Sequence, residues 1–299
     1  MLKIAFNKNY ILPLPKEHRF PMIKYELIPL QLLHEGLVNK NNFFSPKKIS
    51  SNWIEKCHSK IYINKLNSLS LTKSEIRKTG FPLSKELVKR EYIISEGTRL
   101  CVDYAIKYKA AANIAGGTHH AFKDRGEGFC LFNDVAIGSF YAIEKFHIDN
   151  VLIIDLDVHQ GNGTASIMKD ENKVFTFSMH GKKNYPFKKE ISDLDIELDD
   201  NIEDDQYLHL LSNGIKKIDR LMSPQIIFYI SGVDILSTDK LGRLNISREG
   251  CKKRDDIVYE YAHKNNIPVI TSMGGGYSTK IYDIVEAHCN TFKSMLDLI

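Results

Sequence analysis

Short apolar runs rich in β-branched residues recur along the chain and alternate with segments of helical periodicity. Apolar runs of about four to eight residues are typical of buried strands in a parallel sheet. The expected strands are Lys3–Phe6, Ala111–Ala115, Val151–Asp157, Val174–Ser178, Gln225–Ser231 and Pro268–Ser272. The expected helices are Tyr25–Leu37, Ser50–Leu69, Ser84–Lys109, Asp134–Phe146, Thr164–Lys169, Asp205–Leu221, Ser247–Asn265 and Ile281–Leu298. This repetition predicts a doubly wound, mostly parallel α/β sheet with helices on both faces.

Length and composition indicate one domain over residues 1–299. Apolar side chains make up 43% of the 299 residues, which is enough to bury one large core. No internal repeat or low-complexity linker interrupts the pattern, and the least regular stretch, Lys182–Asp205, is expected to be a long surface loop. Reactive groups in open parallel sheets collect beyond the carboxyl ends of the strands, so functional motifs are expected there.

Charge, cysteine content and hydropathy argue against several classes of protein. The 41 Lys and Arg residues barely exceed the 37 Asp and Glu residues and are scattered, so nucleic-acid binding is not indicated. Five cysteines form no Cys-x-x-Cys pair, which argues against a disulfide framework and favours a reducing compartment. No signal-peptide core is found, and the apolar runs are too short to span a bilayer. We expect a soluble, cytoplasmic protein.

The apolar run from Val151 ends with three polar side chains, Asp155, Asp157 and His159. In an extended segment these share one face, and burying them without a partner is costly. They either cap the next helix or bind a metal, and Asp with His supplies the oxygen and nitrogen ligands of catalytic zinc. Such sites use three protein ligands, and Asp234, directly after another apolar run, offers a third unless it is itself a helix cap.

Two glycine-containing turns also follow expected strands. Gly116–His120 ends with His119 and His120, and adjacent imidazoles suit proton transfer because they titrate near neutral pH. A pair of metal ligands or an incidental surface pair are the alternatives. Met273–Tyr277 contains three glycines but lacks the Lys-Ser/Thr of a phosphate-binding loop. A turn that aims the phenol of Tyr277 into the crevice is therefore favoured over a phosphate cradle.

Six motifs, taken in order, resemble the motif set of the histone-deacetylase superfamily. They are Gly-Gly-Thr-His-His-Ala at 116–121, Gly-Phe-Cys-Leu-Phe-Asn-Asp at 128–134, Asp-Leu-Asp-Val-His-Gln-Gly at 155–161, Ser-Met-His at 178–180, Gly-Val-Asp at 232–234 and Gly-Gly-Gly-Tyr at 274–277. The resemblance extends from about Tyr10 to the C-terminus. It implies the arginase/deacetylase fold and a zinc-dependent hydrolase that removes an acyl group from an amine, above all from acyl-lysine.

The resemblance also implies roles for matching residues. Asp157, His159 and Asp234 correspond to the ligands of a single Zn²⁺ ion. The implied catalytic residues are His119 and His120 as tandem histidines, Asp155 as the carboxylate that orients the first, and Tyr277 as the phenol that polarises the acyl carbonyl. The implied structural K⁺ site comprises the carbonyls of Asp155, Asp157, His159 and Met179 and the hydroxyl of Ser178.

The substrate contacts implied by the resemblance come from four places in the sequence. Gly128 corresponds to the carbonyl that holds the substrate amide, and Phe129 to one wall of an acyl-lysine tunnel. Tyr185, in Asn-Tyr-Pro, corresponds to the facing wall. Arg19, in His-Arg-Phe-Pro, is placed along an internal product channel.

One position departs from the pattern of many family members. Where those members supply an Asp to the second histidine, this chain has Asn162, a variant that resembles class IV and related bacterial enzymes. An amide stabilises an imidazolium less than a carboxylate does. We therefore expect the pKa of His120 to be less elevated than in relatives that carry Asp.

Several other functions are weighed against an acyl-lysine hydrolase. An arginase-like enzyme with two metal ions needs an Asp-x-Asp pair, but Leu236 stands where the second Asp is required. An acetylpolyamine amidohydrolase, acting on an acylated small amine, uses the same catalytic residues and stays open. A non-catalytic acyl-lysine-binding protein is expected to lack a ligand, a histidine or the tyrosine, and none is missing. Acyl-chain length and oligomeric state are not specified by these residues.

Overall fold

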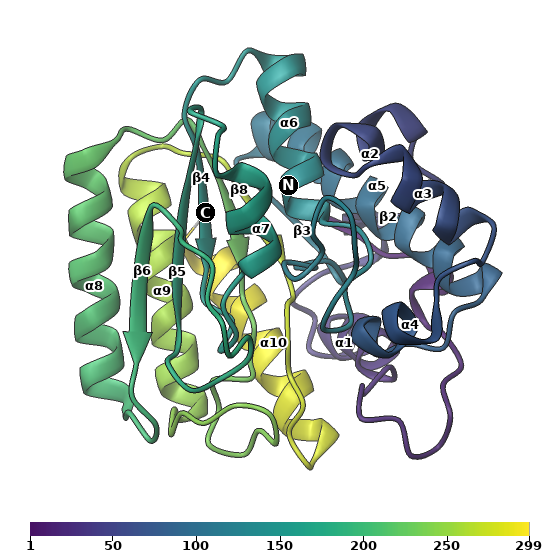
Figure 1. Cartoon of the computed structure of the whole chain (residues 1–299). Coiled ribbons are helices and arrows are strands. Elements are labelled where there is room, and N and C mark those ends of the chain that lie inside the picture. The colour runs from purple at the N-terminus through teal and green to yellow at the C-terminus, as the bar shows by residue number, and fades with distance from the viewer. Residues whose placement is uncertain (299) are drawn as a thin grey trace.

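The computed structural model describes residues 1–298, and one sheet of eight parallel strands forms its centre (Figure 1). The strands are β1 (Lys3–Ala5), β2 (Phe43–Phe44), β3 (Ala110–Asn113), β4 (Val151–Asp155), β5 (Val174–Gly181), β6 (Leu194–Leu198), β7 (Ile226–Ile230) and β8 (Val269–Ser272). Their order across the sheet is β2-β1-β3-β8-β7-β4-β5-β6, and every neighbouring pair is parallel. The predicted α/β class is confirmed, and the sheet is wholly parallel.

Helices cover both faces of the sheet. They are α1 (Lys24–His34), α2 (Ser51–Cys57), α3 (Lys60–Asn67), α4 (Lys73–Thr79), α5 (Lys85–Tyr108), α6 (Asp134–Phe146), α7 (Asn162–Met168), α8 (Asp204–Leu221), α9 (Arg248–Lys264) and α10 (Ile281–Leu298), with the 3-10 helices η1 (Lys8–Tyr10) and η2 (Lys40–Asn42). Phe228 of β7 packs against Gly138 of α6, whereas the next residue, Tyr229, donates a hydrogen bond to Asp255 of α9. Because neighbouring strand residues face opposite sides, α6 and α9 lie on opposite faces.

Several segments differ from the sequence prediction, which also lacked the two-residue strand β2 and the short helices η1 and η2. The predicted helix Ser50–Leu69 is interrupted at His58, where the backbone is extended and Ser59 caps a new helix by accepting a hydrogen bond from the amide of Tyr62. The predicted loop Lys182–Asp205 contains the edge strand β6. Helix α4 was not predicted, although Thr72 and Glu75 form a capping box at its start.

The strand order decides where a functional site can form. The carboxyl ends of β3, β8, β7 and β4 adjoin in the middle of the sheet, and each of the predicted catalytic motifs follows one of these four strands. Within residues 1–298 no helix combines the length and apolar character that crossing a bilayer requires.

Candidate active site

β4 supplies the first functional side chains, because polar residues begin where its buried run ends. Beyond Asp155 the chain turns: Asp155 Oδ1 accepts a hydrogen bond from the amide of Asp157 at 3.2 Å, and Asp157 Oδ1 accepts one from the amide of His159 at 3.0 Å. The intervening Leu156 and Val158 are fully buried in the core. Asp157 and His159 instead line a cavity at the carboxyl edge of the sheet.

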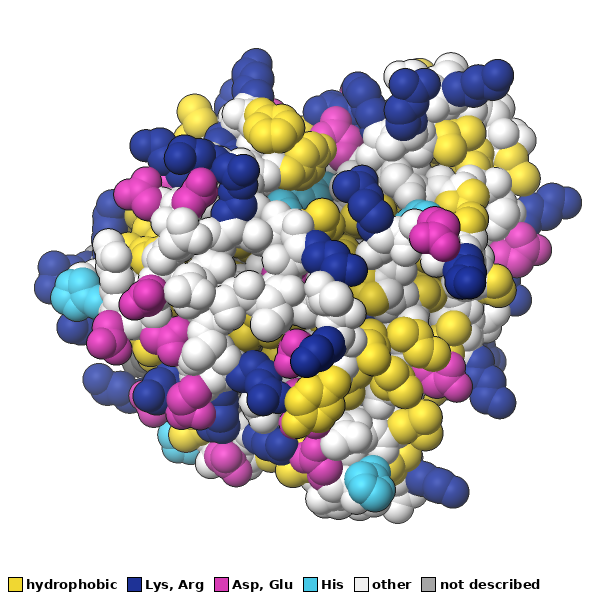
Figure 2. All heavy atoms as spheres, turned by 90° about the horizontal axis from the view of Figure 1, so that it is seen from below, with side chains coloured by type: hydrophobic (Ala, Val, Ile, Leu, Met, Phe, Trp, Pro, Cys, Tyr) yellow, Lys and Arg dark blue, Asp and Glu magenta, His cyan; other side chains and the backbone are white. Residues whose placement is uncertain are grey.

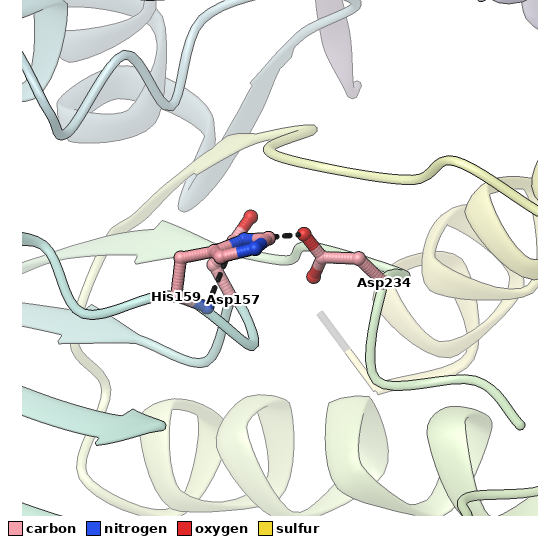
Figure 3. A group of neighbouring side chains, drawn as sticks. All are labelled: Asp157, His159 and Asp234. Atoms are coloured by element: carbon pink, nitrogen blue, oxygen red, sulfur yellow. Dashed lines mark hydrogen bonds and ion pairs between the residues drawn. The ribbon is translucent and has the colours of Figure 1, made fainter. Parts of the chain in front are cut away.

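The three predicted zinc ligands lie together (Figure 3). Asp234 follows β7, and its Oδ1 accepts a hydrogen bond from the amide of Val158 at 3.0 Å. Nδ1 of His159 lies 3.0 Å from Oδ1 of Asp157 and 3.1 Å from Oδ2 of Asp234. One potential ligand atom from each residue lies within 4.8 Å of the other two. Two carboxylates and an imidazole are donors that suit a catalytic zinc ion.

The electrostatics of this buried cluster also fit a cation. Burial and the charge of Asp157 raise the pKa of Asp234 to about 7, because two neighbouring carboxylates resist ionising together. Burial alone would lower the pKa of His159, but hydrogen bonds to both carboxylates raise it to about 10. A divalent cation would offset the negative charges of both carboxylates. The types of ligand atom and their total charge therefore both favour a divalent cation at this site.

The tandem histidines lie beside this cluster in opposite electrostatic surroundings. Their ring centroids are 4.1 Å apart, and both side chains are buried. Nδ1 of His119 lies 2.7 Å from Oδ2 of Asp155, and this carboxylate outweighs burial and raises the pKa of His119 to about 9. Nδ1 of His120 lies 2.6 Å from Oδ1 of Asn162. Burial and the charges of His119 and His159 hold the pKa of His120 well below its usual value. These shifts favour the protonated form of His119 and the neutral form of His120.

The glycine turn after β8 brings a phenol to the same place. The amide of Gly275 donates a 2.7 Å hydrogen bond to Asp157, so this amide is paired with a carboxylate and the turn is not a phosphate cradle. The ring of Tyr277 lies 6.4 Å from that of His159, between centroids. The backbone of Tyr277 is held by Asp239, whose Oδ2 accepts a hydrogen bond from its amide at 2.6 Å. Asp239 was not predicted, because an acidic residue in a loop carries no specific signal.

A wide outer pocket opens over the cluster, with a small cavity behind it. The outer pocket has a volume of about 690 Å³ and is lined by all four predicted substrate contacts, Arg19, Gly128, Phe129 and Tyr185. The inner cavity has a volume of about 30 Å³. Residues that line both spaces are His120, Gly128, Phe129, His159 and Tyr277. The candidate reactive groups therefore lie where the wide pocket meets the narrow cavity.

The basic residue that lines the inner cavity is not the predicted Arg19. Arg19 is exposed and lines the outer pocket, not the inner cavity. The cavity is lined instead by Arg90 of α5, which is buried, pairs with Glu91 and donates to a backbone carbonyl at 2.7 Å. Lys24 is also fully buried, and burial lowers its pKa to about 8. The sequence feature that could have identified Arg90 as a buried cation is the pair Arg90-Glu91 inside a predicted helix that continues with apolar residues.

Comparison with known proteins agrees with this arrangement. The family model described as the histone deacetylase domain matches residues 18–292. The chain belongs to the histone deacetylase family. It is 36% identical to an uncharacterised protein of Picosynechococcus over 99% of this chain and 98% of that protein. It is 32% identical to histone deacetylase 2 of Arabidopsis thaliana over 92% of this chain and 74% of that protein. Membership of the histone deacetylase family supports a deacetylase activity in general.

A solved structure shows the same fold. The crystal structure of a histone deacetylase homologue from Aquifex aeolicus superimposes with a TM-score of 0.86 at 23% identity, covering 100% of this chain and 84% of that one. The deacetylase-like fold predicted from the sequence is thereby confirmed.

Three of the five residues assigned to potassium by resemblance to histone deacetylases lie on the adjacent strands β4 and β5, and the other two, Asp157 and His159, follow β4. Asp155 of β4 is paired in register with Ser178 of β5, and Met179 follows in the same strand as a fully buried residue. The hydroxyl of Ser178 lies 2.9 Å from Nδ1 of His180. The strand pairing brings these residues side by side, and the ion itself stays a prediction.

Proposed function

We propose that this protein is a zinc-dependent amidohydrolase that removes an acyl group from the side-chain amine of acyl-lysine. The observation that carries the proposal is the buried cluster of Asp157, His159 and Asp234 next to the imidazole of His120 and the phenol of Tyr277. His120, His159 and Tyr277 line both the outer pocket and the inner cavity. We propose further that residues 1–299 act as one catalytic domain, a view supported by the family match over 18–292.

Asp157, His159 and Asp234 would hold the zinc ion. Bound there, the ion would supply Lewis-acid polarisation of the acyl carbonyl and activation of a water molecule. The carboxylates are oriented by backbone amides, since Gly275 donates to Asp157 and Val158 donates to Asp234. Contacts of this kind fix ligand geometry and typically affect metal affinity by about 10–100-fold when they are lost.

His120 is the proposed proton carrier. Its Nδ1 is engaged by Asn162, so Nε2 is the atom that takes a proton from the attacking water. The same proton passes to the amide nitrogen as the C–O bond forms and the C–N bond breaks, which releases an amine and a carboxylic acid. His119, held as a cation by Asp155, adds positive potential where negative charge develops. Tyr277 would donate its hydroxyl proton in a hydrogen bond to the same developing charge.

Phe129 and Tyr185 would flank the methylene chain of the substrate lysine. The ring of Tyr185 stands perpendicular to that of His120 with centroids 5.0 Å apart, and the ring of Phe129 lies 5.9 Å from that of Tyr277. Burial of each methylene contributes about 0.8 kcal/mol. The carbonyl of Gly128, in the same pocket wall, is proposed to accept a hydrogen bond from the substrate amide.

The size of the inner cavity favours a small acyl group. A single water molecule needs about 10–15 Å³ on this kind of measure. The cavity of about 30 Å³ therefore has room for a group the size of acetyl but not for a long chain. We propose acetyl-lysine as the preferred acyl form, and a panel of acetyl-, butyryl- and octanoyl-lysine peptides should show falling turnover with increasing chain length.

Two further features belong to the proposal. The strand ends at Asp155, Ser178 and Met179 are proposed to bind a structural potassium ion. The five cysteines are all buried and unpaired among residues 1–298. Unpaired cysteines support the proposal that the protein acts in a reducing compartment such as the cytoplasm.

The experiment is a deacetylation assay combined with metal analysis. Purified protein should contain about one zinc ion per chain and release acetate from an acetyl-lysine peptide. The Asp234→Asn variant should lose zinc and turnover, whereas Asp205→Asn, an exposed carboxylate at the start of α8, should keep both. Zinc-loaded protein that cleaves an acetylated polyamine but no acyl-lysine peptide would support the small-amine alternative instead.

A further inference from the structure

Basic side chains surround the mouth of the outer pocket. Five residues that line this pocket carry a positive charge: Arg19, Arg77, Lys78, Lys183 and Arg243. Glu127 is the one carboxylate among the lining residues. Figure 2 looks onto the carboxyl edge of the sheet, and several Lys and Arg side chains stand around a hollow on this face. Five cations and one carboxylate give the lining a formal charge of +4, which equals the net charge of the whole chain.

Most of these cations are not neutralised by neighbouring carboxylates. Within residues 1–298, Arg19, Arg77 and Lys78 lie within 4.0 Å of no carboxylate oxygen and are exposed. Lys183 and Arg243 share a single partner, Asp200, at 3.5 and 3.2 Å.

Glu127 does not offset this charge, because it is already engaged. Its Oε1 accepts a hydrogen bond from Nε of Arg125 at 2.7 Å, and its Oε2 accepts one from the hydroxyl of Tyr185 at 2.6 Å. The mouth is therefore positive overall. A concave surface with one sign of charge focuses its field and raises the local concentration of oppositely charged ligands.

The cations are spread over separate segments around the mouth. Arg19 precedes α1, Arg77 and Lys78 lie in the last turn of α4, Lys183 follows β5, and Arg243 lies between β7 and α9. A small anion would meet one of these segments at a time, whereas an extended peptide crossing the mouth meets several. Phe187, 91% exposed in the same lining, offers an apolar contact to a peptide side chain.

We propose that the preferred substrate is an acyl-lysine flanked by Asp or Glu residues in a peptide or protein segment. The inference rests on the proposed hydrolase activity and names its substrate class. The five cations at the mouth, which together form its basic rim, attract the flanking carboxylates. The acyl-lysine side chain, which carries no charge, enters the pocket. A cationic acetylpolyamine would be repelled by the same rim.

The test compares acetyl-lysine peptides that differ only in the flanking charge. Three matched peptides carry two Glu, two Gln or two Lys residues on each side of the acetyl-lysine. Exposed ion pairs each contribute a modest amount, so several together should give a kcat/KM ratio of roughly tenfold for Glu over Gln at low salt. The ratio should shrink at about 1 M salt, where screening acts within about 3 Å, and the Lys peptide should be the poorest substrate.

Rim variants locate the effect on the protein. Arg77→Gln combined with Arg243→Gln should reduce the Glu-over-Gln ratio to about threefold or less, mainly through KM. Lys145→Gln is the matched control, because this exposed lysine lies in the last turn of α6, ahead of the amino end of β4 and thus at the opposite edge of the sheet. It should leave the ratio unchanged. A ratio near one in the wild-type protein, or an equal loss in the control, would overturn the proposal.

Binding measurements separate this inference from the hydrolase proposal. Rhodamine-labelled Glu and Gln peptides are titrated with wild-type protein and followed by fluorescence anisotropy. Tighter binding of the Glu peptide, abolished in the Arg77 and Arg243 double variant, supports the basic mouth even where turnover is absent, and absence of turnover then counts against the hydrolase alone. Equal binding of both peptides, or displacement by an equimolar single-stranded oligonucleotide, overturns the acidic-peptide assignment.

Discussion

Tyr277 places a single hydroxyl at the boundary between the two cavities, so its contribution can be removed without changing the shape of the site. We predict that Tyr277→Phe lowers kcat roughly 10²–10³-fold, the effect expected for loss of one donor to a developing oxyanion. Zinc content should be unchanged, because the phenol is not among the proposed ligands. Tyr282→Phe removes a hydroxyl from an exposed residue of α10 and should retain full activity. Comparable losses in both variants would contradict the role.

Asn162 is the hydrogen-bond partner of Nδ1 of His120, so a charge introduced at this position should change the pKa of that imidazole. In Asn162→Asp, a carboxylate would replace the amide oxygen that lies 2.6 Å from Nδ1 of His120 and would raise the pKa of this imidazole. A base must be unprotonated to act, so kcat/KM falls as pH falls through that pKa. The acidic limb of the kcat/KM profile should therefore move to higher pH, by roughly one unit. A limb that stays in place would show that another group controls it.

Glu127 is predicted to position the tunnel wall. Its carboxylate accepts a 2.6 Å hydrogen bond from the hydroxyl of Tyr185 and so fixes a ring that stands against His120. Glu127→Gln should raise KM for an uncharged acetyl-lysine peptide several-fold and change kcat by less than about twofold. Tyr185→Phe removes the same hydrogen bond from the other side, so the double variant should be no worse than either single one. Additive effects would mean that the two residues act separately.

At the scale of elements, the glycine turn after β8 is packed directly against Asp157 and Asp234, two of the three proposed zinc ligands. A Cβ atom at Gly275 would lie 2.0 Å from Oδ2 of Asp234 and 2.8 Å from Oδ2 of Asp157. Gly275→Ala should therefore push both carboxylates aside and lower zinc affinity at least tenfold, measured by competition with a chromogenic chelator. Gly36→Ala is the control: its left-handed backbone, with φ of +67°, strains the substitution, but no atom lies within 4 Å of its Cβ position. Unchanged zinc affinity in Gly275→Ala would show that the backbone of the turn can shift to accommodate the added methyl group.

Local sequence patterns predicted a helix or strand only where the element buries one continuous apolar face or is buried on all sides. The bounds of α6 and α10 match the prediction, because their apolar stripes are continuous. Strand β6 was missed since Leu-Asp-Ile-Glu-Leu is a half-exposed edge strand whose short alternation lies within a charged stretch. The break at His58 was missed because the cause is distant: the amide of Ser59 donates to the carbonyl of Lys123. Contacts of that range leave no local periodicity.

At the scale of the whole molecule, His58 couples folding stability to pH. It is buried, its Nε2 accepts a hydrogen bond from the amide of Asn133 at 2.9 Å, and its Nδ1 donates to the carbonyl of Phe122 at 2.9 Å. These contacts require the neutral ring and join α2 to the start of α6. Burial lowers the pKa of His58 from 6.5 to about 4. Its contribution is therefore complete above pH 6.5 and is lost as pH falls toward 4.

The prediction is a difference in unfolding free energy between two proteins. From pH 7 to pH 4.5 the wild type should lose about 2 kcal/mol more than His58→Gln, which has no titratable group there. Urea unfolding at both pH values measures this difference. His34→Gln, a substitution in the last turn of α1, should keep the wild-type pH dependence. Parallel pH dependence in wild type and His58→Gln would contradict the assignment.

The sequence by itself determined the class of sheet and pointed to the candidate reactive groups, because buried strands and the polar residues at their ends are local patterns. These patterns left open whether Asp157, His159 and Asp234 bind a metal or cap helices, and the resemblance to the histone deacetylases gave them, the paired histidines and Tyr277 their expected roles. Tertiary structure alone decided that β3, β8, β7 and β4 are neighbours, and hence that these groups meet. It also shifted the pKa values of His119 and His120 in opposite directions and placed Arg90 inside and Arg19 at the mouth of the outer pocket. Such properties depend on burial and on contacts between segments distant in the chain, which no local pattern records.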